Sequence, residues 1–307
     1  MSVVAHMLYA ASMNRVALPF RRKLLGLALG LPVFGACAPS AAKPGTEVEQ
    51  LAVLEARSGG RLGVCLIDGA SGENRLLYRA GERFPMCSTF KLMLAGAVLA
   101  KAVREPGLLE SRLPIAATDL VNYSPLTEKR VGAGMSVEEL CRAALQYSDN
   151  TAANLLIRLL GEPASVTAFA RLIGDGDFRL DRWETELNSA VPGDVRDTTT
   201  PAAMAASLRA LGLGEALPMG ERRRLDGWLQ GNTTGGKRIR AGLPAGWSIG
   251  DKTGSGGYGT TNDIAILRSP RGQSYTLAVY FTQPRADAKW ADSVVATAAS
   301  IAVRNLG

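Results

Sequence analysis

The stretch MCSTFKLMLAGAVLA, residues 86–100, decides how we expect this chain to fold, because it joins a serine to a long apolar run. The run predicts a buried helix that begins near Ser88. Ser88 and Lys91 are three residues apart and share one helix face, so the lysine amine lies within reach of the serine hydroxyl. The N–H groups at a helix N-terminus also favour the negative charge that develops during attack on a carbonyl. The stretch therefore predicts a nucleophilic serine with lysine as its base.

Alone, this motif is weak, because a chain of this length contains on the order of one match to serine, any two residues and lysine by chance. The plain alternative is an N-cap serine followed by a solvated lysine. Three further clusters change the balance: Ser148-Asp149-Asn150 between two predicted helices, Lys252-Thr253-Gly254 at a strand end, and Arg182-Trp183-Glu184-Thr185-Glu186-Leu187-Asn188 in an irregular segment. Separately they read as a helix cap, a turn and a solvated loop. Their joint occurrence is hard to assign to chance.

The N-terminal residues predict an export signal. Four basic residues, Arg15, Arg21, Arg22 and Lys23, precede the apolar residues 24–36, and small residues follow. This run is too short to span a bilayer. We expect residues 1–37 to be removed and the mature protein to be periplasmic, with Met13 as an alternative start. Because Cys37 follows small residues, a lipid anchor there and a soluble form both remain open.

Removal of this leader changes the composition of the chain in two ways. The leader holds four of the 35 basic residues, which leaves 31 basic against 28 acidic residues and no basic block that predicts binding to nucleic acid. It also holds His6, the sole histidine, so the mature chain has no imidazole for a Ser-His-Asp triad or for zinc. The remaining cysteines, Cys65, Cys87 and Cys141, are odd in number and lack metal-site spacing, so we predict no disulfide, metal or cofactor.

The order of predicted elements gives the fold class. A helix over 46–57 and strands over 61–67 and 75–79 open the mature chain, residues 88–230 are mainly helical, and strands over 247–253, 262–268 and 275–282 precede a helix over 288–303. This order predicts an α+β fold, an α/β sandwich with an antiparallel sheet built from both chain ends plus an inserted all-α domain. Within a domain over 38–307, we place a sheet subdomain at 45–80 and 231–307 and a helical subdomain at 81–230. The sequence GSGGYG at 254–259 resembles a dinucleotide fingerprint, but a strand pattern follows where that fingerprint needs a helix.

Taken together, the four clusters resemble the signature of the class A serine β-lactamases, which combines Ser-x-x-Lys, Ser-Asp-Asn and Lys-Thr-Gly. The resemblance spans residues 45–305 and includes the segment 196–201, Arg-Asp-Thr-Thr-Thr-Pro. It implies hydrolysis of penicillins and cephalosporins through an acyl-enzyme on Ser88, with the β-lactam as the small-molecule partner. We also expect a monomer.

The resemblance also implies a role for each site residue. Lys91 and Ser148 would handle the proton of Ser88, and Glu184 with Asn188 would hold the deacylating water. Asn150 would bind the acylamide side chain, and Lys252 and Thr253 would bind the substrate carboxylate. The backbone N–H groups of Ser88 and Ser255 would form the oxyanion hole. Tyr123 would stack at the cleft edge, and Arg182 would pair with Asp197 at the base of the Glu184 loop. Arg238, fourteen residues before Lys252, stands where one branch carries an arginine that binds the carboxylate; otherwise it is a solvated turn residue. Whether Lys91 or Glu184 is the acylation base remains open.

Some positions depart from parts of the family. Thr185 follows Glu184 where some members have proline. Cys141 stands where some members have a disulfide, but Ala95 occupies the position expected for its partner. Cys87 is present, but Gly256 stands where the carbapenem-hydrolysing branch has its partner cysteine, so carbapenem turnover is not expected as the main activity. Asn122, Ser255 and the run 256–258 resemble the cefotaxime-hydrolysing branch, which predicts oxyimino-cephalosporins as substrates.

Two other functions use the same serine and lysines. One is a penicillin-binding D-alanyl-D-alanine peptidase, and the other is a β-lactam sensor that stays acylated. Glu184 and Asn188 argue against both, because they predict that the acyl-enzyme is hydrolysed.

Overall fold

The computed structural model describes residues 45–306. The predicted export leader, the alternative start at Met13 and the candidate anchor Cys37 lie outside the described residues.

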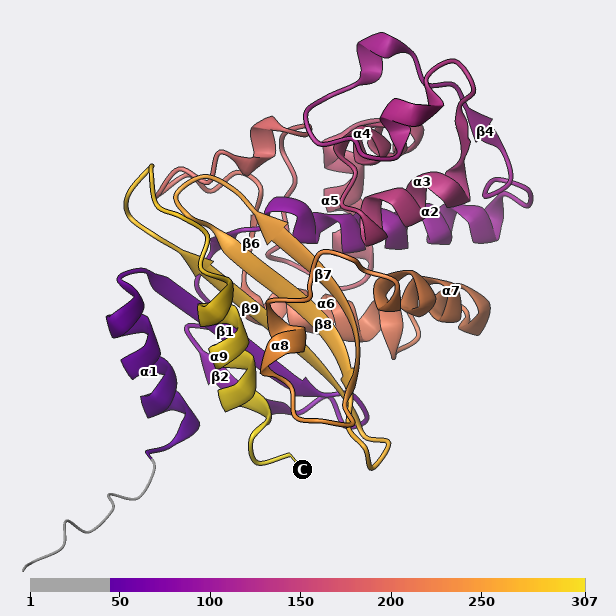
Figure 1. Ribbon diagram of the computed structural model, residues 1–307. Coiled ribbons are helices and arrows are strands. Elements are labelled where there is room, and N and C mark those ends of the chain that lie inside the picture. Colours follow the sequence, from indigo (N-terminus) through magenta and orange to yellow (C-terminus); the bar gives the residue numbers. More distant parts are fainter. Residues whose placement is uncertain (1–44, 307) are drawn as a thin grey trace, which may run out of the picture. The chain divides into compact units, whose positions relative to one another are not determined.

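A five-stranded antiparallel sheet, built from both ends of the chain, forms the centre of the fold (Figure 1). Its order is β2-β1-β9-β8-β7, with β1 (Arg61–Asp68) and β2 (Asn74–Tyr78) from the first part of the chain and β7 (Ser248–Ser255), β8 (Thr261–Arg268) and β9 (Ser274–Thr282) from the last. Strand β1 pairs with β9 over its whole length, from Arg61 opposite Thr282 to Asp68 opposite Tyr275. The predicted sheet is confirmed. The turn after β7 returns directly as β8, as the residues after the glycine-rich run predict.

One face of the sheet is covered by three helices. They are α1 (Glu47–Ser58), α8 (Ile239–Gly242) and α9 (Asp292–Val303), and Figure 1 shows α8 and α9 in front of the sheet. Their apolar side chains form one core with the facing strand residues, in which Leu51, Val279 and Val295 are buried. Helix α1 begins with a capping box between Thr46 and Glu49, so its start follows from local sequence.

The opposite face carries the larger core and the helical part of the chain. Helix α6 (Pro201–Gly212) packs on β1, β8 and β9, and α7 (Met219–Gln230) packs on β7. Beyond them lie α2 (Lys91–Arg104), α3 (Val137–Gln146), α4 (Asn150–Leu160) and α5 (Pro163–Leu172). Helix α2 contacts α3, α4, α5, α6 and α7, and most of its residues are buried. The apolar run after Ser88 is therefore the centre of the helical part. The predicted subdomain boundaries remain a prediction.

Several elements differ from the predicted ranges. Ser88 lies within a 3₁₀ turn, η1 (Cys87–Phe90), and α2 begins only at Lys91. The C-terminal helix begins at Asp292, four residues after the predicted start, because residues 285–291 form a loop. Short elements that the sequence analysis omitted are α8, the strand pairs β3 (Phe84–Pro85) with β6 (Thr198–Thr199) and β4 (Arg112–Leu113) with β5 (Met135–Ser136), and the 3₁₀ turns η2 (Ala117–Asp119), η3 (Thr127–Arg130) and η4 (Glu186–Asn188).

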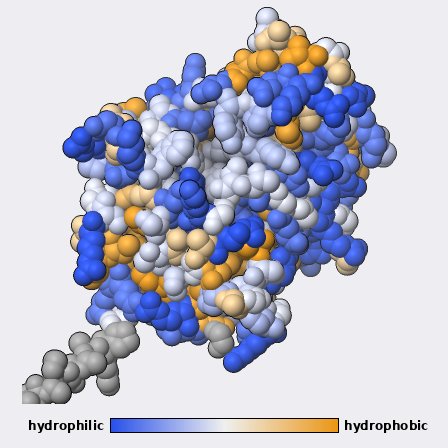
Figure 2. Space-filling model, viewed as in Figure 1, coloured by the Kyte–Doolittle hydropathy of each residue, from blue (hydrophilic) through white to orange (hydrophobic). Residues whose placement is uncertain are grey.

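The surface in Figure 2 is mostly hydrophilic, with apolar residues in separate patches. No helix within residues 45–306 combines the length and the apolar character needed to cross a membrane. Cys65, Cys87 and Cys141 are each free and buried.

Candidate active site

The turn that carries Ser88 is packed tightly against the edge strand β7. Ser88 is nearly buried, and Cys87 before it has a left-handed backbone with φ of 47°. Gly254 in β7 makes this packing possible, because a Cβ there would lie 2.7 Å from the carbonyl oxygen of Met86. The glycine of Lys252-Thr253-Gly254 thus lets β7 approach the turn that carries Ser88, which brings the first and last predicted clusters together.

Lys91 is fully buried, and its Nζ lies among oxygen atoms from three elements. It lies 3.0 Å from Ser88 Oγ, 2.8 Å from the Ser148 carbonyl oxygen, 2.6 Å from Asn150 Oδ1 and 2.9 Å from Glu184 Oε1. Burial lowers the pKa of Lys91, and the Glu184 carboxylate opposes this shift. Burial therefore makes the amine a better acid than an exposed lysine, while its contacts hold it against the serine hydroxyl.

Ser148 stands between two buried lysines. Its backbone is left-handed, with φ of 58°, and its Oγ lies 3.4 Å from Lys91 Nζ and 3.1 Å from Lys252 Nζ. Burial, followed by the nearby charge of Lys91, holds the pKa of Lys252 well below its ordinary value. The Ser148 hydroxyl thus links the Lys91 amine beside Ser88 to the Lys252 amine of β7.

Glu184 is buried beside both Ser88 and Lys91. Its Oε1 lies 3.5 Å from Ser88 Oγ, and its Oε2 accepts a 2.6 Å hydrogen bond from Asn188 Nδ2. The peptide bond between Glu184 and Thr185 is cis. Asn188 Oδ1 is buried and has no hydrogen-bond partner among the described residues. The Glu184 carboxylate thus lies beside Ser88, and it accepts from Asn188, whose amide oxygen is unsatisfied among the described residues.

The loop that carries Glu184 is held by an internal arginine, as expected. Arg182 Nε lies 2.6 Å from Asp197 Oδ2, which confirms the predicted pair, and Arg182 Nη1 donates to Ser189 Oγ at 3.0 Å. The loop is also tied to the sheet, because Gly257 N donates to the Asn188 carbonyl oxygen at 2.9 Å. These contacts fix Glu184 and Asn188 from both sides.

A cleft of about 720 Å³ opens next to this cluster. Ser88, Ser148, Asn150, Asn188, Thr253, Ser255, Tyr123 and Arg238 all line it. Tyr123 stands at its edge with 55% of its surface exposed. Thr253 Oγ1 lies 2.5 Å from Thr234 Oγ1, and Asn150 Nδ2 donates to the Asn122 carbonyl oxygen. The structure thus brings the predicted site residues to one cleft or to the buried cluster beneath it.

Arg238 is 6% exposed, so the alternative of a solvated turn arginine is wrong. Its Nε lies 2.7 Å from Asp292 Oδ1, and its Nη2 donates to Ser255 Oγ at 2.6 Å. Its Nη1 donates to the carbonyl oxygens of Gly254 and Asn262. The guanidinium is therefore locked against β7 and β8 at the cleft wall.

The sequence analysis missed several residues of the site, among them Asn154, Trp290 and Asp292. Asn154 clamps the backbone of Glu184, because its Oδ1 accepts from the Glu184 N–H and its Nδ2 donates to the carbonyl oxygen, both at 2.9 Å. Its signal was available, since it lies four residues after Asn150 on one helix face. Asp292 and Trp290 also line the cleft, and Trp290 Nε1 donates to the Gly256 carbonyl oxygen at 3.0 Å. They follow an irregular loop, and no local pattern places them there.

Among residues 45–306, no group of histidine, cysteine and acidic side chains is arranged to hold a metal ion. The polar groups gathered at the described cleft are the Ser88 and Ser148 hydroxyls, the Lys91 and Lys252 amines and the Glu184 carboxylate.

Comparisons with known proteins agree with this geometry. A family model described as "Beta-lactamase enzyme family" matches residues 46–306. Beta-lactamase OXY-1 of Klebsiella oxytoca is 53% identical over 287 residues, which cover 94% of this chain and 98% of the relative. Beta-lactamase Toho-1 of Escherichia coli is 52% identical over 281 residues, or 92% and 96% of the two chains.

Solved structures give the same result. The β-lactamase from Desulfarculus baarsii superposes with a TM-score of 0.83 at 52% identity, covering 85% of this chain and 97% of that chain. A mutant of the last common ancestor of Gram-negative bacteria class A β-lactamase reaches a TM-score of 0.82 at 56% identity, covering 85% and 98%.

Proposed function

The chain belongs to the class A β-lactamase family and hydrolyses β-lactams, and from this premise we propose that Ser88 forms the acyl-enzyme that Glu184 and Asn188 then deacylate. The observation that carries the proposal is the buried cluster in which Lys91 Nζ lies 3.0 Å from Ser88 Oγ and 2.9 Å from Glu184 Oε1. The nucleophile, a candidate base and a water-activating carboxylate stand within one hydrogen-bonded group.

Acylation begins when Ser88 Oγ attacks the carbonyl carbon of the β-lactam ring and loses its proton. Lys91 Nζ at 3.0 Å and Glu184 Oε1 at 3.5 Å are both within reach of that hydroxyl, so two routes for the proton are open. The backbone N–H groups of Ser88 and Ser255 form the oxyanion hole that receives the developing charge. The ring C–N bond breaks, and Ser148, hydrogen-bonded to Lys252 Nζ, returns a proton to the leaving nitrogen.

The cleft wall orients the substrate. The substrate carboxylate binds at Lys252, Thr253 and Ser255, with Arg238 behind Ser255. Asn150 binds the acylamide side chain from the opposite wall, and Tyr123 closes the edge. The substrate carboxylate also favours protonated Lys252, because it brings an opposite charge to an amine whose pKa is lowered by burial and by Lys91.

Deacylation needs a base for water, and the described chain offers no imidazole in the cleft. Glu184 Oε1 lies 3.5 Å from Ser88 Oγ, and its Oε2 accepts from Asn188, whose Oδ1 has no hydrogen-bond partner among the described residues. A water molecule bound between them would lie next to the acyl ester. This arrangement favours a lactamase over a peptidase or a sensor that stays acylated.

The test is the variant Glu184→Ala. We expect it to fold, to accept benzylpenicillin covalently and to lose turnover by about 10³-fold or more, equal to roughly 4 kcal/mol of transition-state stabilisation. Intact mass spectrometry should show the protein plus one drug mass for minutes to hours, whereas wild type returns to its free mass. Glu186→Ala, which removes an exposed acid two residues away, is the matched control and should turn over like wild type.

Two outcomes would change the assignment. If Glu184→Ala turns over like wild type, the carboxylate does not activate the water. If wild type itself remains acylated, this chain acts as a penicillin-binding or sensor protein despite its family.

The substrate range is a separate proposal, in which oxyimino-cephalosporins are hydrolysed as well as penicillins. It rests on the resemblance of Asn122, Ser255 and residues 256–258 to the cefotaxime-hydrolysing branch. Steady-state hydrolysis of benzylpenicillin, cefotaxime and a carbapenem by the purified protein tests it. We expect the first two to be turned over and the carbapenem to be much slower; a kcat/KM for cefotaxime no higher than that for the carbapenem would contradict the proposal.

We also propose export to the periplasm, from the basic and apolar residues of the leader. Fractionation of cells that express the full chain should place the activity in the periplasm or on a membrane. The variant Cys37→Ser separates these two forms. If the enzyme is lipid-anchored, the variant moves from the membrane fraction to the soluble periplasmic fraction, whereas a soluble enzyme stays where it is.

A further inference from the structure

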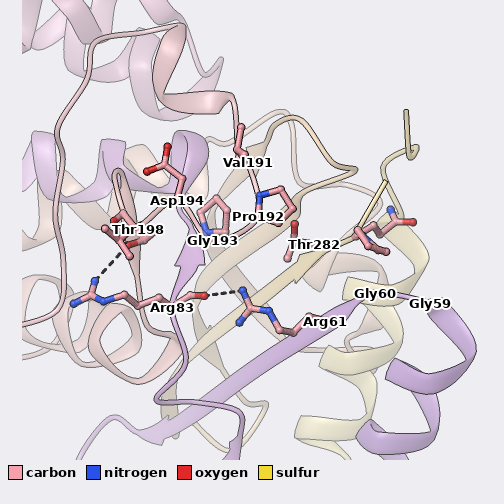
Figure 3. A pocket seen from close by; sticks show the side chains of 15 residues that line it. Gly59, Gly60, Arg61, Arg83, Val191, Pro192, Gly193, Asp194, Thr198 and Thr282 are labelled. Carbon is pink, nitrogen blue, oxygen red and sulfur yellow. Dashed lines mark hydrogen bonds between the residues drawn. The ribbon is translucent and has the colours of Figure 1, made fainter. Parts of the chain in front are cut away.

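Outside the catalytic cleft, a cavity of about 450 Å³ has Arg61 and Arg83 in its lining (Figure 3). Both guanidinium groups are already paired, Arg61 with Glu82 at 3.1 Å and Arg83 with Asp177 at 3.4 Å. Figure 3 shows the Arg83 guanidinium beside Thr198 and away from that of Arg61. This cavity therefore does not present two free cations to an anion. The wall of the catalytic cleft, by contrast, carries a row of hydroxyl groups that suits a carboxylate.

This row begins behind the cleft, where the turn after α7 packs on the edge strand β7. Asn232 is 9% exposed, and its Nδ2 donates to Oδ2 of Asp251, which is fully buried in β7. Arg240 Nη2 lies 2.7 Å from the other carboxylate oxygen, Oδ1. A Cβ at Gly235 would collide with Asp251 Oδ2, so the glycine lets the turn close on the strand. The orientation of the Asn232 amide is thus fixed: its N–H donor faces Asp251, and its oxygen faces the other way.

Two threonines continue the row from Asn232 to the cleft. Asn232 Oδ1 accepts from Thr234 N at 3.0 Å and from Thr234 Oγ1 at 2.8 Å. Thr234 Oγ1 lies 2.5 Å from Thr253 Oγ1, and both residues line the cleft. A hydroxyl has a single hydrogen, and that of Thr234 is directed at Asn232, so the hydrogen between the two threonines belongs to Thr253. Thr253 therefore points its hydrogen away from the cleft when the cleft is empty.

A carboxylate in the cleft requires the opposite direction. It only accepts hydrogen bonds, so Thr253 must turn its hydrogen outward, and Thr234 must then supply the hydrogen between the two hydroxyl oxygens. Asn232 Oδ1 still accepts from Thr234 N at 3.0 Å after this change. The row can thus reverse without leaving a buried acceptor unpaired, which is the costly outcome for a polar group in the protein interior.

We propose that Thr234 is a positioning residue for the substrate carboxylate, because it donates its hydroxyl hydrogen to Thr253 when the substrate binds. This inference rests on the proposed function, in which the carboxylate of the β-lactam binds at Lys252 and Thr253. Thr253 then donates a charge-assisted hydrogen bond to the carboxylate, and the hydrogen bond that it accepts from Thr234 strengthens this donation. Asn232 and Asp251 hold Thr234 in place from behind.

The variant Thr234→Val tests the proposal, because valine has a similar shape but cannot donate a hydrogen bond. We expect the second-order rate constant for acylation by benzylpenicillin to fall about tenfold, since Thr253 loses the donor behind it. Thr234→Ser keeps the hydroxyl and should recover most of this loss. With the methyl ester of benzylpenicillin, which lacks the carboxylate charge, Thr234→Val should slow acylation by no more than about twofold.

Quenched intact mass spectrometry of the purified protein measures acylation separately from turnover. A wild type that becomes acylated and stays so would contradict the proposed deacylation by Glu184, but every rate constant of this test would still be measurable. The failure of the proposed function and the failure of this inference are therefore distinguishable.

Thr233→Val is the matched control. Thr233 also lines the cleft, but it is exposed, and its Oγ1 donates to the Gln146 carbonyl oxygen at 2.8 Å. This variant should be acylated like wild type. An equal loss for the acid and the ester in Thr234→Val would give Thr234 a general structural role and overturn the proposal. An unchanged rate with benzylpenicillin in Thr234→Val, or no recovery in Thr234→Ser, would overturn it as well.

Discussion

Two buried amines, those of Lys91 and Lys252, lie within reach of the single hydroxyl of Ser148. Lys91 and Lys252 both contact Ser148 Oγ, and burial lowers the pKa of each. Glu184 opposes that shift at Lys91, whereas the charge of Lys91 adds to it at Lys252. Each amine therefore has a distinct electrostatic setting: the Glu184 carboxylate favours the charged form of Lys91, whereas the charge of Lys91 disfavours the charged form of Lys252.

Arg238 is held at the cleft wall behind Ser255, close to the proposed site of the substrate carboxylate. We predict that Arg238→Ala raises KM for benzylpenicillin by about tenfold or more with a smaller change in kcat, because one charge-assisted contact near the carboxylate is worth about 1.5 to 3 kcal/mol. Steady-state kinetics measures both constants. The thermal stability of the variant should be measured alongside the kinetics, because Asp292 and two carbonyl oxygens lose their hydrogen-bond donor when Arg238 is replaced.

Lys237→Ala provides the matched control for this experiment. Lys237 also lines the cleft, but its side chain is exposed. We expect a much smaller change in KM there. Unchanged kinetics in a folded Arg238→Ala protein would limit Arg238 to a structural role between β7, β8 and α9.

At the scale of elements, the start of α4 holds the second motif in place. Asp149 is fully buried and caps the helix, because its Oδ1 accepts from Ala152 N at 2.9 Å. The same carboxylate accepts from Leu126 N, Thr127 N and Thr127 Oγ1. The helix-cap interpretation of this motif is thus confirmed at Asp149, while its neighbours Ser148 and Asn150 line the cleft, where their functional roles are proposals.

We predict that Asp149→Ala lowers the free energy of unfolding by about 3 kcal/mol or more, because three backbone N–H groups lose a buried acceptor. Ser136→Ala removes the part-buried cap of α3 and should cost only about 1 kcal/mol. Urea unfolding followed by circular dichroism gives both values. Equal losses in the two variants would show that the buried contacts of Asp149 add nothing to simple capping.

Elements with a local signal were predictable from the sequence, and those without one were not. The capping box at Ser136 predicts the start of helix α3, and the alternating residues after Gly259 predict strand β8; both predictions are confirmed. The four-residue helix α8 and the two-residue pair β3–β6 are too short for any periodicity, and β3 meets β6 only after the chain has passed through 112 intervening residues. Asn154 and Asp292 belong to the site through contacts across the fold, which a linear pattern does not contain.

At the scale of the whole molecule, the cleft lies where the two ends of the chain meet its middle. Lys252, Thr253 and Ser255 come from the edge strand of a sheet that needs β1 and β9, while Ser148, Asn150 and Glu184 come from the helical part. The positions of Lys252, Thr253 and Ser255 relative to Ser88 therefore depend on the packing of β7 against the Ser88 turn, which Gly254 permits.

A buried acid in β8 makes the stability of the molecule depend on pH. Asp263 is fully buried in β8; its Oδ2 accepts from Ile239 N at 3.1 Å, and its Oδ1 has no partner among the described residues. Burial, followed by the charge of Asp251, holds the pKa of Asp263 well above its ordinary value. The folded protein thus keeps a proton that the unfolded chain releases above about pH 4.

This shift has a definite sign. Below the ordinary pKa both states are protonated and Asp263 contributes no pH dependence, whereas between that value and the folded pKa the folded state binds more protons, so stability falls as pH rises. Asp263→Asn removes this dependence. The free energy of unfolding of the variant, relative to wild type, should therefore increase from pH 4 to pH 7, by at most about 1.4 kcal/mol per pH unit. Urea unfolding at pH 4, 5.5 and 7 measures it, and Asp287→Asn, at an exposed acid, should show no such increase. A constant difference between Asp263→Asn and wild type across this range would mean that Asp263 is ionised in the folded enzyme.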